Sequence, residues 1–142
     1  MIKISWARFW LSFFVGWVIS SQLNWAAAEL LLNPIVTPML DGFMRTADNT
    51  SGAEIVRMTL GYTAPVLVGA FLLAAMDKPA HWAARALFLG LLVSLTSFYG
   101  TYTFISGWGA VNWVPLMITA TFDMVTLTLG LLTIGLLQNW RR

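Results

Sequence analysis

Apolar residues are grouped into four long segments that are separated by short polar stretches. The segments cover approximately residues 5–32, 53–76, 81–106 and 113–137. Each has at least the roughly 20 residues that an α-helix needs to cross the hydrocarbon core of a bilayer. The pattern therefore predicts an all-α polytopic membrane protein, an antiparallel four-helix transmembrane bundle with short loops, in a single membrane domain of residues 1–142.

Turn-forming residues mark the expected ends of these segments. Proline discourages a helix from continuing, so Pro34 predicts that the first helix ends near Asn33. A polar loop is expected from there to Ser51, with part of it as a short helix on the membrane surface. The second and third helices are expected to end at Asp77-Lys78-Pro79 and Gly107-Trp108-Gly109.

Composition supports the membrane assignment and removes several kinds of chemistry. Hydrophobic residues make up 58% of the chain and charged residues only 10%, which is unlike a typical soluble domain. The chain has no cysteine, so disulfides and thiol chemistry are excluded, and its single histidine excludes most zinc and haem arrangements. We therefore expect no metal site and no cofactor. The net charge of +2 is too small to favour nucleic-acid binding.

Positive charge predicts the orientation, because Lys and Arg gather in short cytoplasmic segments. Three regions that fall on one side of a four-span arrangement carry such residues: Lys3 and Arg8, Lys78 and Arg85, and Arg141 and Arg142. Both termini are thus expected in the cytoplasm. An alternative is a signal peptide cleaved after Ala26-Ala27-Ala28, but the apolar stretch continues through Leu32, which favours a retained span.

Asp123 is the most informative polar residue, because it lies about ten residues inside the last apolar segment. An acid at such depth costs several kcal/mol unless it is paired, hydrated or protonated, so it indicates a functional site. At helical spacing it shares one stripe with small and polar residues that should face the bundle: Asn112, Pro115, Thr119, Thr126, Gly130 and Thr133. The alternative is a structural acid whose hydrogen bonds are satisfied by neighbouring helices.

Counting 1.5 Å per helical residue from the outer helix ends predicts which side chains share the depth of Asp123. The candidate ligand or proton site consists of Asp123, Gln22, Asn24, Tyr62, Thr96, Tyr99 and Thr119. Gln22 shares a face of the first helix with Glu29, whereas Asn24 shares a different face with Ser20. Only one of Gln22 and Asn24 is therefore expected to reach the layer.

A second candidate cluster, nearer the outer surface, consists of Glu29, Glu54 and Arg57. Glu54 and Arg57 are one helical turn apart and are able to pair locally, while Glu29 has a similar predicted depth and is an alternative partner for Arg57. The simplest interpretation is an interfacial ion pair that only fixes helix packing.

The layout resembles small four-span bacterial membrane protein families of unknown function. The resemblance covers nearly the whole chain in outline, including Val15-Gly16-Trp17 and residues 130–137, and its motifs are weak. It implies the bacterial inner membrane as the location and supplies no catalytic residues.

Three functions remain open. The first is a non-enzymatic accessory or interaction subunit that packs against other membrane subunits or itself as a homo-oligomer. The second is a small carrier or channel with its polar intramembrane site around Asp123. The third is an intramembrane enzyme acting on a lipid-like substrate, which would require a second titratable group within hydrogen-bond reach of Asp123.

Overall fold

The computed structural model describes residues 4–40 and 51–140, and all regular elements within these ranges are helical. The long helices are α1 (Trp6–Ala27), α3 (Gly52–Ala75), α4 (Trp82–Ser94), α5 (Gly100–Trp108) and α6 (Trp113–Asn139). A π-helical turn, η4 (Leu95–Tyr99), joins α4 to α5. After α1 come another π-helical turn, η1 (Ala28–Leu32), the short α2 (Asn33–Val36) and a 3₁₀ turn, η2 (Thr37–Met39).

Polar side chains fix where several helices begin. Ser5 caps α1 by accepting a hydrogen bond from the Arg8 amide, and Asn112 caps α6 by accepting one from the Val114 amide. The single histidine, His81, has the same role for α4, since its Nδ1 atom accepts a hydrogen bond from the Ala83 amide. These caps satisfy backbone N–H groups that have no partner within the helix.

The first helical segment continues beyond Asn33, where the sequence predicted its end. Pro34 lies in α2, directly after the π-helical turn, in which the Asn33 amide donates to the Ala28 carbonyl five residues earlier. A widened turn already changes the hydrogen-bond register, so the missing N–H of proline is tolerated there. The extension also buries Leu32, Val36 and Leu40 against Leu116 of α6. Of the predicted loop, residues 41–50 lie outside the described part of the chain.

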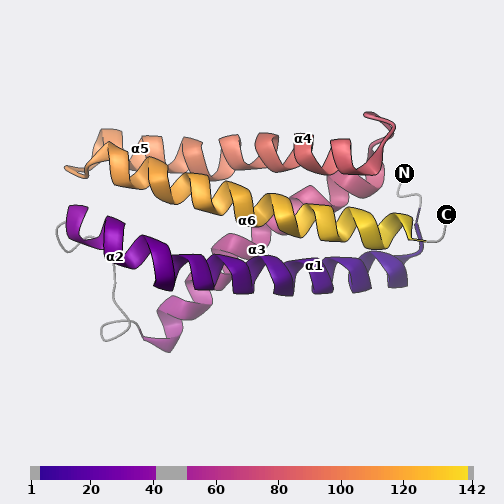
Figure 1. Cartoon of the computed structure of the whole chain (residues 1–142), viewed down its shortest axis with the longest axis horizontal. Coiled ribbons are helices and arrows are strands. Elements are labelled where there is room, and N and C mark those ends of the chain that lie inside the picture. The colour runs from indigo at the N-terminus through magenta and orange to yellow at the C-terminus, as the bar shows by residue number, and fades with distance from the viewer. Residues whose placement is uncertain (1–3, 41–50, 141–142) are drawn as a thin grey trace.

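Helix α6 is the centre of the bundle. In Figure 1 the nearly straight helix formed by α4, η4 and α5 lies along one side of α6, α1 and α2 lie along the other, and α3 crosses behind them. The largest fully buried side chains include Phe9 of α1, Leu89 of α4, and Leu127, Leu131 and Ile134 of α6 itself. The start of α1 and the end of α6 lie at the same end of the bundle (Figure 1).

Three helices are long and apolar enough to cross a membrane: α3, the continuous helix Trp82–Trp108, and α6. Helix α1 has the necessary length, with 22 residues, but is not among them. It carries the polar residues Ser12, Ser20, Gln22 and Asn24 within its apolar sequence. Ser12 and Ser20 are fully buried against the rest of the bundle, so part of this polarity faces inward.

Glycines allow α1 and α6 to approach closely. A Cβ atom placed on Gly130 would lie 2.6 Å from the Cβ atom of Ser20, and one on Gly16 would lie 2.8 Å from the Gly130 carbonyl oxygen. Both distances are well inside van der Waals contact, so only glycine fits at these positions without a shift of the helices. Small residues play this role at many membrane helix interfaces.

We predict that Gly130→Ala destabilises the bundle by about 1–3 kcal/mol, because the added methyl group forces α1 away from α6. The measurement is thermal unfolding of the purified chain in mild detergent. Gly61→Ala is the matched control, since nothing lies within 4 Å of a Cβ atom at Gly61. Equal unfolding temperatures for the two variants would contradict the close approach.

Candidate functional site

Asp123 lies buried in the middle of α6, and both of its carboxyl oxygens accept hydrogen bonds from other helices. Asn24 of α1 donates from Nδ2 to Oδ1 over 2.7 Å, and Tyr102 of α5 donates from its hydroxyl to Oδ2 over 2.9 Å. The side chain is 7% exposed. Each carboxyl oxygen thus has one donor, and the two donors come from different helices. These hydrogen bonds offset the free-energy cost of burying the carboxyl group.

The hydrogen bonds continue from Asp123 to α3 through hydroxyl groups. The Asn24 amide also donates to Thr126 Oγ1 over 3.1 Å, and that oxygen lies 2.8 Å from the Tyr62 hydroxyl. The Tyr62 hydroxyl lies 2.6 Å from Ser20 Oγ, which donates to the Thr126 carbonyl over 2.9 Å. We call Ser20, Asn24, Tyr62, Tyr102, Asp123 and Thr126 the polar layer.

The polar layer is internally consistent as a hydrogen-bond network. Asn24 uses one amide proton for Asp123 and the other for Thr126. The Thr126 hydroxyl also lies 3.1 and 3.2 Å from the Phe122 and Asp123 carbonyl oxygens, to which it is able to donate instead. If Thr126 donates to Tyr62 and Tyr62 donates to Ser20, each hydroxyl donates once and the chain ends on the Thr126 carbonyl, which needs no proton. Such fully satisfied networks hold neighbouring helices in one relative rotation.

Not all residues of the predicted site join this layer. Asn24, Tyr62 and Asp123 do, whereas Gln22 is exposed on the other side of α1. Thr96 is exposed and bonds to carbonyls of its own helix, at Leu92 and Val93.

Tyr99 and Thr119 have other partners as well. The Tyr99 hydroxyl lies 2.7 Å from Thr121 Oγ1, on an exposed side of α6. Thr119 is buried one turn from Asp123, but its hydroxyl donates to the Pro115 carbonyl. Of the seven predicted residues, three therefore belong to the polar layer and four lie outside it.

The depth count missed three members of the layer, Ser20, Tyr102 and Thr126, and of these Tyr102 is the one that donates to the Asp123 carboxyl group. The count placed Tyr99 at the depth of Asp123, on the assumption of uniform α-helical geometry. Tyr99 does reach α6 near this depth, but at Thr121 on the exposed side, because the count gave the depth of each residue and not the face of the helix on which it lies. A tyrosine side chain also reaches about one turn along the axis. Only the spacing of Tyr102 three residues after Tyr99 hinted at a second hydroxyl near this depth.

The three residues of the predicted outer cluster have separate environments. Glu54 caps α3, because its Oε2 atom accepts hydrogen bonds from the Ser51 amide at 2.7 Å and the Ser51 hydroxyl at 2.5 Å. Glu29 and Arg57 are both exposed. The capping contacts of Glu54 explain why this acid stands at the start of a helix.

A small pocket between α1 and α3 leads to the polar layer. Its volume is about 80 Å³, and it is lined by Ser21, Asn24, Trp25, Met58, Thr59 and Tyr62. Asn24 and Tyr62 belong to the polar layer, so a small polar molecule in this pocket would contact Asn24, one of the two donors to Asp123. Within the described ranges, no group of three or more His, Cys, Asp or Glu residues is placed to hold a metal ion.

Comparison with known proteins adds no family to this picture. No protein-family model matches the chain, no curated protein matches its sequence, and no solved structure matches its fold. The resemblance to small four-span bacterial membrane proteins therefore stays an expectation, and the argument for function rests on the geometry.

We predict that Tyr102→Phe destabilises the bundle by about 0.5–1.5 kcal/mol, because it leaves Asp123 Oδ2 without its donor. Tyr99→Phe is the matched control. It removes a hydroxyl of the same kind from the same helix, but from an exposed contact, so its effect should be within about 0.5 kcal/mol. Thermal unfolding of both variants in one detergent measures the difference. A larger loss in Tyr99→Phe would show that the wrong tyrosine has been assigned to Asp123.

Proposed function

We propose that the chain is a non-enzymatic subunit of the bacterial inner membrane that crosses the bilayer four times and assembles with another membrane polypeptide. The observation that carries this proposal is the unpartnered outer half of α3. Separate features support the bilayer, the partner and the non-enzymatic role.

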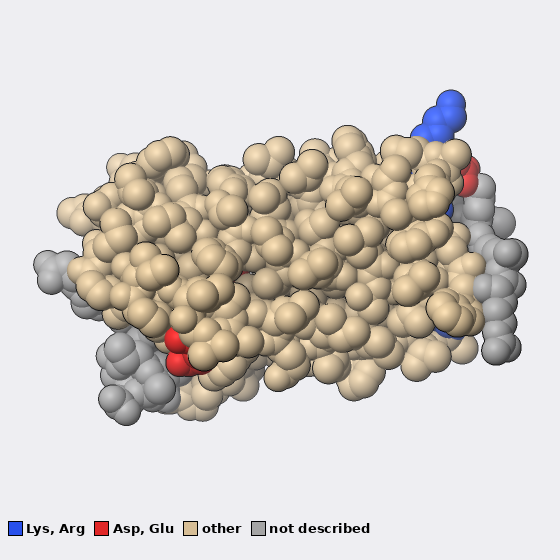
Figure 2. All heavy atoms as spheres, viewed as in Figure 1, with Lys and Arg blue, Asp and Glu red and all other residues tan. Residues whose placement is uncertain are grey.

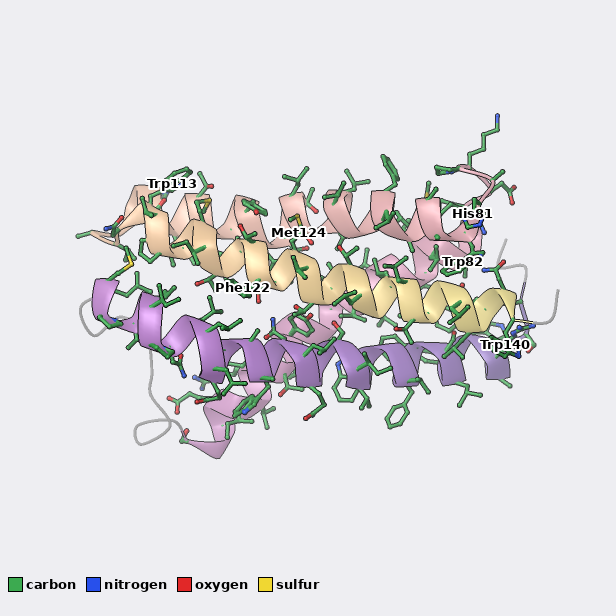
Figure 3. The ribbon with its side chains drawn as sticks, viewed as in Figure 1. His81, Trp82, Trp113, Phe122, Met124 and Trp140 are labelled. Carbon is green, nitrogen blue, oxygen red and sulfur yellow. The ribbon has the colours of Figure 1, made fainter. Side chains whose placement is uncertain are left out.

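The distribution of charge supports insertion of the whole bundle in a bilayer. Figure 2 shows charged side chains toward the two ends of the long axis and a broad uncharged belt between them. Trp113 lies near one end, and Trp82 and Trp140 lie near the other (Figure 3), as expected for indole rings at the two headgroup layers. In the proposed orientation, the end with Arg8, Lys78 and Arg85 faces the cytoplasm.

The outer half of α3 packs against little of the described chain. Every residue from 52 to 61 is exposed except Glu54, which is half-buried, whereas Pro65, Val66, Gly69 and Ala70 are buried in the bundle. Ile55, Val56, Met58 and Leu60 are 41–63% exposed and lie on several faces of the helix. Apart from Met58 and Thr59, which line the pocket shared with α1, this apolar half of the helix packs against few of the described residues and offers a surface for a second helix.

Arg57 favours a protein neighbour for this surface over lipid alone. It is exposed among these apolar residues, and no described side chain forms an ion pair with it. A cation at this position is stabilised by a carboxylate on a partner helix, as intramembrane charges are commonly paired.

The surroundings of Asp123 favour a structural role over catalysis. Both oxygens are already engaged by Asn24 and Tyr102, and the pocket of about 80 Å³ has neither Asp123 nor Tyr102 in its lining. The phenol of Tyr102 is a titratable group within reach, but it donates to the carboxyl group rather than to a cavity where a substrate would bind.

We predict that a photo-crosslinking amino acid at Val56 or Leu60, in native membranes, gives a protein adduct of one defined mass. The matched control positions are Leu87 and Leu91, which have the same spacing on α4 and are 49% and 51% exposed. These should give lipid adducts only. Protein adducts at all four positions, or at none, would count against the proposed interface.

A small carrier with its site at the polar layer is the second candidate, and the pocket beside Asn24 and Tyr62 favours it. Its volume of about 80 Å³ is enough for two or three water molecules. The contact of Asn24 with Asp123 would then connect this water to the carboxyl group.

The carrier hypothesis predicts that proteoliposomes with an internal pH dye respond to an imposed ion gradient, and that Asp123→Asn abolishes the response. Asparagine keeps an acceptor for Asn24 while its amide group faces the Tyr102 hydroxyl, so the variant should remain folded. If the chain is only a structural subunit, wild type and Asp123→Asn should both behave like empty liposomes.

A further inference from the structure

A groove runs along the outside of α1 and α6 at the end of the bundle where α1 begins and α6 ends. Its volume is about 580 Å³, and it is lined by Arg8, Leu11, Ser12, Val15, Leu137 and Trp140. From Arg8 to Val15 the groove follows eight residues of α1, which rise about 10 Å along the helix axis. It is therefore much larger than the pocket beside the polar layer and is separate from it.

The groove has one cationic end. Arg8 donates from Nε to the Leu137 carbonyl over 3.0 Å and from Nη2 to the Trp140 carbonyl. These bonds satisfy carbonyl groups at the C-terminus of α6 and hold the guanidinium group at the groove. Nη1 has no hydrogen-bond partner among the described residues, so its protons are available to an anion.

The rest of the groove is apolar. Leu11 is 66% exposed, and Val15 and Leu137 are partly exposed beside it. Ser12 adds no free donor, because its hydroxyl is buried and donates to the Phe9 carbonyl over 2.8 Å. The groove thus combines a single positive group at one end with an apolar wall that extends toward the middle of the bundle.

We infer that this groove binds one anionic phospholipid, with the lipid phosphate at Arg8 and an acyl chain along Leu11, Val15 and Leu137. The inference rests on the proposed insertion of the bundle in a bilayer. Trp140, 56% exposed at the same end, fits the headgroup layer. The two residues that follow it in the sequence are both arginines, so positive charge is concentrated in this part of the chain. Basic sites between helices on the cytoplasmic side are suited to anionic headgroups.

The test is native mass spectrometry of the full chain, purified from mild detergent and titrated with phosphatidylglycerol or phosphatidylcholine. We expect one phosphatidylglycerol molecule per chain, bound about tenfold more tightly than phosphatidylcholine, because both lipids carry a phosphate but the choline ammonium cancels the net negative charge of phosphatidylcholine. Arg8→Gln should remove this preference. Lys78→Gln, which removes an exposed cation from the same end of the bundle but outside the groove, is the matched control and should leave it unchanged.

A second variant separates lipid binding from the bonds that Arg8 makes with α6. Leu11→Trp fills the groove and leaves Arg8 intact, so it should lower phosphatidylglycerol occupancy at least fivefold. Leu23→Trp places the same bulk elsewhere on α1 and should not. Equal binding of the two lipids by the wild type, or equal losses in each variant and its control, would overturn the inference. Insertion of the chain into nanodiscs, measured in parallel, distinguishes that failure from a failure of the membrane proposal itself.

Discussion

The hydrogen bonds on Asp123 are the constraint on which the helix arrangement depends. An acid in the middle of α6 has to be satisfied by donors from other helices, because the surrounding side chains are apolar. Asn24 and Tyr102 meet this requirement from α1 and α5, and Thr126 carries the network to Tyr62 of α3. These hydrogen bonds fix the rotation of each surrounding helix about its own axis relative to α6. In an apolar bundle, where packing alone discriminates weakly among rotations, such a layer specifies the arrangement more than it adds stability.

The spacing between helices determines which side chains serve as donors. Gly16 and Gly130 bring the backbones of α1 and α6 so close together that the short side chains of Ser20 and Asn24 reach α6 directly. Helices α3 and α5 contribute tyrosines, whose hydroxyls extend much farther from the backbone. The polar layer therefore depends on the glycine contact, because a change that separates α1 from α6 also removes Asn24 from Asp123.

The sequence predicted the helices and part of the layer for reasons that the structure makes clear. Segment length and hydropathy were sufficient to locate the long helices, and face counting on α1 correctly allowed only one of Gln22 and Asn24 to reach Asp123. The π-helical turns were not predictable, because Ala28–Leu32 and Leu95–Tyr99 look like ordinary helical sequence. The early end assigned to the first helix at Asn33 follows from the first of these turns, whereas Tyr99 was chosen in place of Tyr102 because the count gave depth alone and not the helix face.

The position of the polar layer along α3 connects the two functional hypotheses. Residues 52–61 are largely without neighbours, the packed half begins at Pro65, and Tyr62 lies at the boundary between the two halves. A partner helix that moves the outer half of α3 would therefore displace Tyr62 before any other member of the layer. Its contacts with Ser20 and Thr126 would change first, followed by the position of Asn24 on Asp123. Met58, Thr59 and Tyr62 of α3 also line the pocket beside Asn24, so a partner that moved the outer half of α3 would change the shape of this pocket as well.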